Sequence, residues 1–360
     1  MSAPVADASG DAAAAAAGTE PPSSGERGTG APSVAPTPVI GSPVRTVPGS
    51  AQPAPPGGSG PIGSAGETRM LPGAAIAAEL RERVKRDVAA FRRRHGFAPT
   101  LAIVFVGRDA PSAVYLQQIL RSCRSVGLSG RAVEIPGRVT TTELRRQIEL
   151  LNADPLVAGV IVQMPLPNRI PLRAVIDALD PAKDVDGIDP LNAGLLSLGY
   201  AGFIPATATA AVEILKRSGY VLEGLHAVVI GRSNVVGKPA AQLLMREHCT
   251  VTVCHRRTRD LASHTRVADV VLVAAGSPGL VTGEMLKPGA LVVDVGINVV
   301  GDRIVGDVDP SARGVAAALT PVPGGVGPLT NAILLDHVLR AARAQVGDGS
   351  GRPRRHIAPW

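Results

Sequence analysis

The chain has 360 residues and a net charge of +7, and 45% of its residues are hydrophobic while only 2% are aromatic. Cores with so few rings must be aliphatic, which suits parallel α/β layers. No run approaches the ~18–20 uninterrupted apolar residues of a membrane helix, so a membrane protein is not expected. A positive charge attracts anionic ligands. Nucleic acid is a rival ligand, but no basic stripe or stacking aromatics accompany the charge, and we expect none to bind.

The cysteines argue for an intracellular protein without structural metal. Cys123, Cys249 and Cys254 are odd in number and lack paired spacing. This pattern argues against a disulfide framework and against a zinc site, so no metal is expected. The N-terminus has no basic segment followed by an apolar one, so a secretory signal is not expected. A cytoplasmic location is the simplest interpretation.

Both ends of the chain differ in composition from the middle. Residues 1–69 contain no Leu, Phe, Tyr or Trp and hold 12 of the 32 prolines. Such a segment cannot bury enough apolar surface to offset its ordering entropy, so it is predicted to be disordered. A misassigned start upstream of Met70, or a transit peptide, are the alternatives. Residues 347–360 are predicted to be a disordered tail.

The middle of the chain alternates between strand and helix patterns. Ile76, Leu80, Val84, Val88 and Phe91 recur with helical spacing. Further elements are predicted in the first half, in chain order, as a strand at 101–106, a helix at 112–124, a helix opened by a capping box at Thr140 and Glu143, and a strand at 158–163. This order is typical of a doubly wound α/β sheet.

A second α/β run begins near Thr207, which is expected to cap a helix. The predicted elements that follow are strands at 226–230, 250–254, 269–274 and 290–295, helices between the first three of them, and a last helix at 329–344. We therefore predict two α/β domains that meet at a cleft, where ligands usually bind.

The second run contains a candidate dinucleotide-binding loop. The segment 228–239 reads as a strand, a turn with Gly231 and Gly237, and the start of a helix. Glycines let the backbone approach a pyrophosphate, and the helix N-terminus faces its negative charge. The motif is not a strict GxGxxG, so a plain βα turn is the alternative.

The end of the next strand selects between the two nicotinamide cofactors. NAD-selective sites place an acidic residue about 20 residues further on, where it accepts the ribose hydroxyl. Here that strand ends in Cys254, His255, Arg256 and Arg257, without an acidic residue. Because arginine binds a 2′-phosphate and a carboxylate would repel it, NADP is favoured over NAD. A solvated basic loop is the alternative.

Several motifs, in the same order along the chain, resemble the methylenetetrahydrofolate dehydrogenase/cyclohydrolase (FolD) family. They are the segments 112–115, 162–167, 183–187, 231–239, 293–298 with 306–308, and 320–330. The resemblance runs from about Met70 to Ala344, and its last motif is highly specific. It implies a catalytic folate-binding domain (70–206 plus 328–346, with the C-terminal helix returning to it), a Rossmann-type NADP-binding domain (207–327), and a homodimer.

The resemblance also implies roles for individual residues. Tyr115 would lie against the pterin, Gln163 would help position the substrate, and Asp186 would hold the amino edge of the pterin. The other implied site residues are Pro323, Gly324 and Gly325 for the substrate, and Gly231, Arg232, Ser233, Gly237, His255, Arg256 and Ile297 for the cofactor. Taken singly, Tyr115 reads as a packing residue, Gln163 as a polar strand end, and Asp186 as a cap of the turn at Gly187.

One residue departs from the family pattern at a chemically important place. The family has a lysine four residues after the tyrosine, one helical turn on, where this chain has Ile119. Lysine can exchange a proton when burial lowers its pKa, and isoleucine cannot. Arg121 lies on a different helical face and is too basic to replace it.

Three functions are compatible with these motifs. The first is NADP-dependent oxidation of 5,10-methylenetetrahydrofolate, in the one-carbon metabolism that serves purine biosynthesis, with cyclohydrolase activity lost or severely weakened. The second is a non-catalytic paralogue that binds folate or NADP. The third is another two-domain dehydrogenase, of the shikimate or amino-acid type, against which the motif at 320–330 argues.

Overall fold

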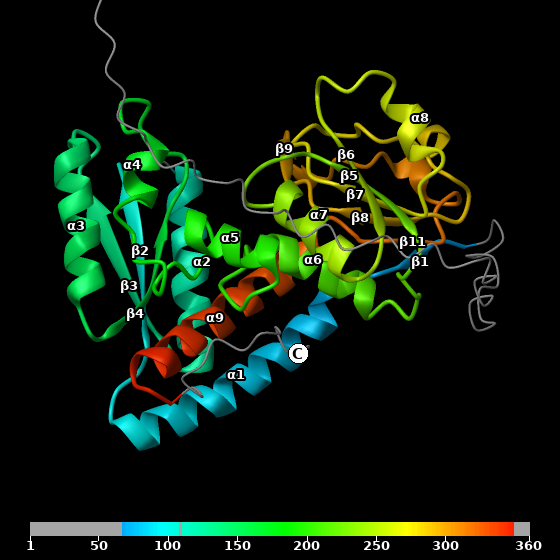
Figure 1. Cartoon of the computed structure of the whole chain (residues 1–360). Coiled ribbons are helices and arrows are strands. Elements are labelled where there is room, and N and C mark those ends of the chain that lie inside the picture. The colour runs from blue at the N-terminus through cyan, green and yellow to red at the C-terminus, as the bar shows by residue number, and fades with distance from the viewer. Residues whose placement is uncertain (1–66, 108–109, 349–360) are drawn as a thin grey trace, which may run out of the picture. The chain divides into compact units, whose positions relative to one another are not determined.

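The computed structural model describes residues 67–107 and 110–348, and only the backbone of residues 110–115. Most of the two segments that are predicted to be disordered, 1–69 and 347–360, therefore lies outside the described residues. The described chain forms two parallel sheets with helices packed on their faces (Figure 1). This confirms the α/β class. Within these ranges no helix combines the length and apolarity that a bilayer span requires.

The first sheet has three parallel strands in the order β3-β2-β4. They are β2 (Thr100–Val106), β3 (Ser129–Ile135) and β4 (Val157–Val162). Alternate residues of β2 face two different cores, because Leu101 and Ile103 pack with one cluster and Ala102 and Val104 with the other. A strand that is buried on both faces reads as a continuous apolar run.

In the first half of the chain, each of the strands β2, β3 and β4 is followed in sequence by one or two helices. They are α2 (Ala110–Val126), α3 (Thr141–Ala153), α4 (Leu172–Ile176) and α5 (Pro190–Leu198). The predicted capping box of α3 is confirmed. Thr140 Oγ1 accepts the amide of Glu143 at 3.2 Å, and the Glu143 carboxylate accepts the Thr140 amide at 2.8 Å.

The second sheet has six parallel strands in the order β1-β11-β8-β7-β5-β6. They are β1 (Arg69–Met70), β5 (His226–Ile230), β6 (Thr250–Cys254), β7 (Val270–Val273), β8 (Leu291–Asp294) and β11 (Ala318–Leu319). From β5 the chain first adds β6 on one side and then β7 on the other. The strand order thus reverses at β5, and open α/β sheets bind ligands at such a switch point.

Connecting elements complete the second half. They are α6 (Ala206–Lys216), α7 (Gly237–Arg246), α8 (Leu261–Thr265), an antiparallel hairpin of β9 (Asn298–Val300) and β10 (Arg303–Val305), two short 3-10 turns at Gly283–Met285 and Pro310–Ala312, and α9 (Val326–Gln345).

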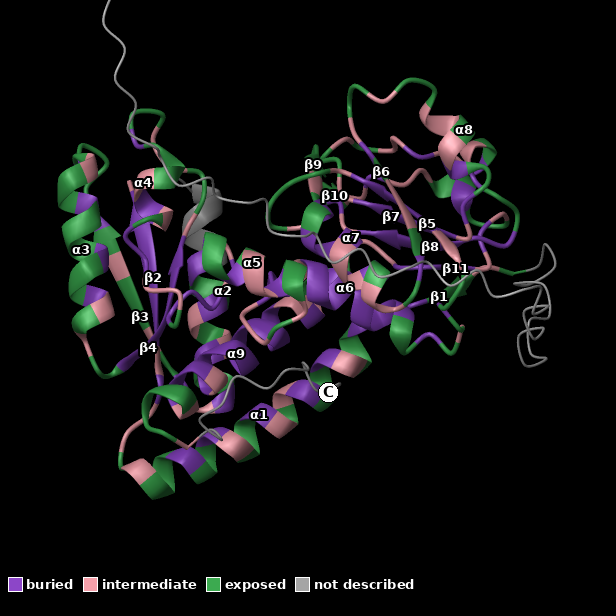
Figure 2. Ribbon diagram, in the orientation of Figure 1, coloured by how far each residue is buried: buried purple, intermediate pink, exposed green. Residues whose placement is uncertain are grey.

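Three helices share one apolar cluster. The first helix, α1 (Gly73–His95), packs along α9, and α9 also contacts α6 and β4. The apolar stripe that predicts α1 is buried as expected at Leu80, Val84, Val88 and Phe91, whereas Ile76 is only half-buried. The buried cluster continues from these helices onto both sheets (Figure 2). The aliphatic composition is therefore used in helix packing as well as in the sheets.

Two local predictions differ from the structure. Thr207 lies inside α6 rather than at its cap, because the helix begins one residue earlier and Pro205 occupies the cap position without a side-chain hydrogen bond. Arg69 and Met70, placed at the expected boundary between the extension and the folate domain, instead form β1 and pair with β11 of the second sheet. A two-residue strand leaves no periodic signal in the sequence.

Candidate functional site

Two predicted substrate residues, Gln163 and Asp186, lie near the carboxyl end of β4 in the first sheet. Gln163 comes directly after β4 and is half-buried, and its amide Nε2 donates to the carbonyl of Met164 at 2.9 Å. Asp184 forms a parallel bridge with Val160 of β4, which places Asp186 near the level at which β4 ends. Carboxyl ends of parallel strands meet at one edge, so Gln163 and Asp186 belong to the same edge.

The loop that carries Asp186 is held by buried polar contacts. Lys183 is 6% exposed, and its Nζ donates to the carbonyls of Leu151 and Asp154 at the end of α3, at 3.1 and 2.7 Å. Asp184 is fully buried, and its Oδ2 accepts the Asp189 amide at 2.8 Å and Asn192 Nδ2 at 2.9 Å. These two members of the motif at 183–187 therefore build the loop.

The Asp186 carboxylate is different, since no hydrogen bond to it is found among the described side chains and backbone groups. The residue is half-buried. Burial raises the pKa of Asp186 to about 6, and the nearby charge of Asp184 acts in the same direction. A desolvated carboxylate without a protein partner is a candidate ligand-binding group. Asp186 does not serve as the cap of the turn at Gly187.

Ile119 is part of the hydrophobic core. Its exposed fraction is 0%, and it continues the apolar face of α2 formed by Leu116, Cys123 and Val126. Arg121 is exposed, as its helical position predicts, and cannot reach the same place. Tyr115 lies in α2, but its side chain is outside the described part of the chain.

The predicted cofactor loop follows β5 at the switch point of the second sheet. Gly231 has φ +125°, and a Cβ atom there would lie 2.2 Å from the Ala274 carbonyl oxygen. A Cβ at Gly237 would lie 2.0 Å from the carbonyl oxygen of Gly231. The loop therefore folds back on itself so closely that both positions require glycine.

Side chains inside this loop fix its shape. Ser233 Oγ accepts the amides of Val236 and Gly237 at 3.1 and 3.4 Å, and Lys238 Nζ donates to Asn234 Oδ1 at 2.8 Å. Ser233 thus caps the entry to α7. Arg232 is exposed at the surface of the loop.

The end of β6 presents the basic residues expected beside the loop, because β6 pairs with β5 in register from His226 to Ile230. His255 is half-buried, and its backbone amide donates to Thr258 Oγ1 at 2.9 Å. The amide of Arg257 donates to His255 Nδ1 at 3.1 Å, so the neutral ring carries its proton on Nε2. Arg256 is exposed. Two donors thus stand where an anionic group could be bound.

The glycine-rich motif at 320–330 connects β11 to α9. Gly324 has φ +106°, Pro323 is exposed, and Gly325 is buried at the start of α9. A Cβ at Gly73, the first residue of α1, would lie 2.1 Å from the Gly325 carbonyl oxygen. This contact ties the motif to α1.

Two aspartates from the motif at 293–298 with 306–308 organise the loops that follow β7 and β8 of the second sheet. Asp307 is fully buried and accepts the amides of Ala275, Gly276 and Ser277 at 2.7 to 2.9 Å. Asp294 accepts the amide of Asp307 at 3.0 Å. Buried acids in an apolar stretch were the available signal, but their partners are distant in sequence and could not be read from it.

Ile297, a predicted cofactor residue, is 68% exposed at the start of the β9–β10 hairpin. Val299, Val300 and Ile304 of this hairpin are also exposed hydrophobic residues. We refer to these four residues as the hairpin patch.

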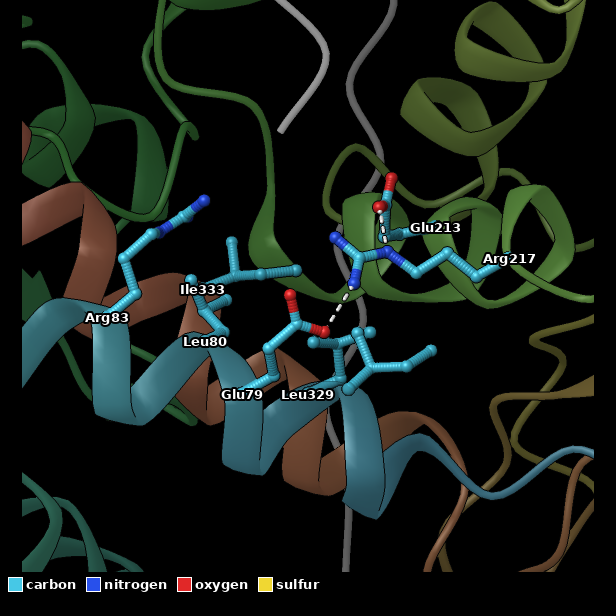
Figure 3. A pocket seen from close by; sticks show the side chains of 8 residues that line it. Glu79, Leu80, Arg83, Glu213, Arg217, Leu329 and Ile333 are labelled. Carbon is cyan, nitrogen blue, oxygen red and sulfur yellow. Dashed lines mark hydrogen bonds and ion pairs between the residues drawn. The ribbon is translucent and has the colours of Figure 1, made fainter.

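A separate small hollow lies where α1, α6 and α9 meet (Figure 3). Within it Arg217 Nε donates to Glu213 at 2.6 Å, and Arg217 Nη1 pairs with Glu79 at 3.0 Å. It has room for about 20 Å³, roughly one water molecule. This volume is too small for folate or a dinucleotide. None of the predicted site residues lines the hollow, so it is also separate from the predicted site.

Comparison with known proteins finds two domain models of one family that match consecutive parts of the chain. A model of the tetrahydrofolate dehydrogenase/cyclohydrolase catalytic domain matches residues 71–186, and a model of the NAD(P)-binding domain of the same family matches residues 205–346. The bifunctional protein FolD of Roseiflexus sp. (strain RS-1) is 48% identical over 279 residues, which cover 77% of this chain and 97% of that protein.

The chain belongs to the tetrahydrofolate dehydrogenase/cyclohydrolase family. Among solved structures of this family, the FolD enzyme of Campylobacter jejuni has a TM-score of 0.74 and 39% identity, covering 77% of this chain and 99% of that one. The Trypanosoma brucei enzyme, complexed with NADP and an inhibitor, has a TM-score of 0.75 and 37% identity, covering 78% and 99%. The resemblance noted in the sequence is thus confirmed.

Proposed function

We propose that the protein is an NADP-dependent dehydrogenase that oxidises 5,10-methylenetetrahydrofolate to 5,10-methenyltetrahydrofolate. The observation that carries this proposal is the half-buried Asp186 carboxylate, which has no hydrogen-bond partner in the described chain, whereas Lys183 and one carboxylate oxygen of Asp184 in the same loop are hydrogen-bonded. The aminopyrimidinone edge of a pterin offers two N–H donors to one carboxylate. It would therefore supply the hydrogen-bond donors that Asp186 lacks within the described chain. Family membership supports the same substrate class.

The substrate would be held by residues around Asp186. We assign Gln163 and Tyr115 to positioning the pterin, the ring of Tyr115 lying against it, and Pro323, Gly324 and Gly325 to lining the site. The positive φ of Gly324 and the buried Gly325 suit a backbone that a ligand approaches closely. Hydride transfer requires orientation and exclusion of water rather than proton transfer, so these residues suffice for it.

The residues of the second sheet fit NADP. Gly231 and Gly237 leave no side chain between the backbone and a pyrophosphate at the start of α7, and Ser233 fixes the loop. Arg232, His255 and Arg256 are the candidates for contact with the 2′-phosphate, and Ile297 for contact with the cofactor. When bound, NADP supplies the hydride acceptor.

We propose further that cyclohydrolase activity is lost or severely weakened. Attack of water on the methenyl carbon needs a group that takes up and returns a proton, and Ile119 occupies that helical position with no exposed surface. General acid–base assistance typically contributes ~10²–10⁴-fold to a rate. The dehydrogenase step does not depend on it to the same degree.

The organisation of the protein completes the proposal. We assign residues 70–206 with 328–346 to folate binding and residues 207–327 to NADP binding. We also propose that the protein is located in the cytoplasm. A homodimer is supported by Val299, Val300 and Ile304 of the hairpin patch, because exposed hydrophobic side chains gathered on one short hairpin are typical of a contact surface. Val299→Asp should then lower the mass measured by sedimentation to that of a monomer, and an unchanged mass would remove this support.

The test of the proposed activity is reduction of NADP in the presence of methylenetetrahydrofolate. The purified protein should form NADPH, with a KM for NADP well below that for NAD. Asp186→Asn should raise the KM for the folate by about tenfold, because a charge-assisted hydrogen bond is lost. A folded protein that binds NADP and folate but forms no NADPH would support the non-catalytic paralogue instead, which the burial of Ile119 favours.

A further inference from the structure

His337 is a buried residue of α9 that no sequence motif explains. It is 1% exposed, and its Nδ1 lies 2.8 Å from the carbonyl oxygen of Val185. The ring packs against Phe203, with the ring centroids 5.4 Å apart. A carbonyl oxygen can only accept, so Nδ1 carries the proton and donates it.

The ring donates as a neutral group. Burial lowers the pKa of His337 to about 3, and the charge of Arg340 acts in the same direction. The contact with Val185 is therefore a neutral hydrogen bond throughout the physiological pH range. It joins α9 to a loop 152 residues earlier in the chain.

The carbonyl that His337 binds belongs to the peptide unit that joins Val185 to Asp186. This unit is planar, so fixing its oxygen fixes the direction in which the Asp186 backbone continues. On the other side, the Val185 side chain is fully buried against β4, where a Cβ at Gly159 would lie 2.5 Å from Val185 Cγ1. The peptide before Asp186 is thus held by β4 through a side chain and by α9 through a hydrogen bond.

We propose that His337 is a positioning residue for the reaction, which holds the Asp186 carboxylate in the orientation that receives the pterin. This inference rests on the proposed function, because it takes Asp186 to be the pterin-binding group. His337 does not touch the substrate. It acts through the Val185 peptide, and its loss should weaken folate binding while it leaves the cofactor site unchanged.

Two variants of similar shape separate the hydrogen bond from the packing. His337→Asn keeps an N–H donor at the δ position, whereas His337→Leu places a methyl group there. We expect His337→Leu to raise the KM for methylenetetrahydrofolate about tenfold, since a buried carbonyl loses its donor and the loop can shift. His337→Asn should stay within about threefold of the parent, and both variants should keep the parental KM for NADP.

Direct binding provides a readout besides turnover. The dissociation constants of a stable 5-substituted tetrahydrofolate and of NADP should be measured for the parent and both variants, together with their melting temperatures. If His337→Leu does not fold, His337→Gln moves the amide beyond the δ position and should raise the folate dissociation constant in its place.

Equal folate constants for the Asn and Leu variants would overturn the inference, even if both melt at lower temperatures, because His337 would then only fill space. In that case the parent would still bind and oxidise folate, and the proposed function would stand. A parent that binds no folate would overturn the proposed function and this inference together.

Discussion

The cofactor loop of the second sheet and the Ile119 face of α2 use the chain in opposite ways. At Gly231 and Gly237 the proposed cofactor contact is made by the backbone itself. Neither position has room for a side chain, because a Cβ would meet the carbonyl oxygen of Ala274 at Gly231 and that of Gly231 at Gly237. At position 119 the cyclohydrolase step of the family would depend on a single lysine side chain. Here the fully buried Ile119 occupies that position. A backbone site is preserved as long as the fold is, whereas a chemistry that depends on one side chain can vanish while the core stays well packed.

The sharpest way to break this comparison is to restore the basic group. Ile119→Lys should raise the methenyltetrahydrofolate cyclohydrolase rate by about 10²-fold or more, because a lysine desolvated at this position can exchange protons. Its stability should fall, since a charge enters a buried position. The cyclohydrolase rate is measured as the disappearance of methenyltetrahydrofolate.

Ile119→Met is the matched control for this variant. It lengthens the side chain without a basic group and should leave the rate near the parental value. If Met and Lys raised hydrolysis equally, space in the core rather than proton transfer would be the missing feature.

A second variant tests the backbone side of the comparison. In Gly231→Ala the new Cβ would meet the Ala274 carbonyl oxygen at a residue with φ +125°. We expect the NADP dissociation constant to rise at least about tenfold, and the unfolding free energy to fall by about 1–3 kcal/mol. Isothermal titration and denaturant unfolding give the two quantities.

Gly224→Ala provides its control, because Gly224 has φ +80° but open space around the Cβ position. It should lose stability through backbone strain alone and bind NADP normally. Equal losses of NADP affinity at the two positions would contradict the role given to the close approach at Gly231.

A smaller effect is expected for the phosphate-binding side chains. Arg256→Ala should weaken NADP binding roughly fivefold to tenfold and leave NAD binding nearly unchanged, because the lost hydrogen bond involves only the 2′-phosphate. Arg259→Ala removes the same charge from the same exposed segment. If it had the same effect, the general field of the loop and not a specific contact would select the cofactor.

The smallest predicted effect is the pH dependence of folate binding. Burial raises the pKa of Asp186 to about 6. The carboxylate is the binding form, so affinity should be full above this pKa and decrease as the pH falls through it, by about fourfold at pH 5.5. Binding of a stable tetrahydrofolate analogue by Asp186→Asn should not vary over this range. A flat profile in the parent would exclude Asp186 as the titrating group.

The sequence predicted those elements whose burial is periodic and local. The stripe of α1, the capping box of Thr140 and the strands β5, β6, β7 and β8 of the second sheet are examples. It did not predict β3 (Ser129–Ile135), since most of this edge strand is at least partly exposed and its apolar pattern is interrupted by Arg131 and Glu134. The hairpin of β9 and β10 was missed for the same reason, because exposed strands carry no burial signal.

The candidate site shows the same division. Glycine positions and the basic end of β6 could be identified from residue types alone. The hydrogen bonds of Asp307 to residues 275–277, and of His337 to Val185, join segments far apart in sequence. No local pattern encodes such pairs, so their roles become visible only in three dimensions.

We propose that this chain keeps hydride transfer and that its hydrolytic activity is lost or severely weakened. This proposal is tested most directly by supplying methylenetetrahydrofolate and NADP to the purified protein and measuring NADPH and methenyltetrahydrofolate together. We expect the two products to accumulate in equal amounts, apart from the hydrolysis measured without enzyme. NADPH that accumulates while the methenyl compound is converted to formyltetrahydrofolate at an enzymatic rate would contradict it.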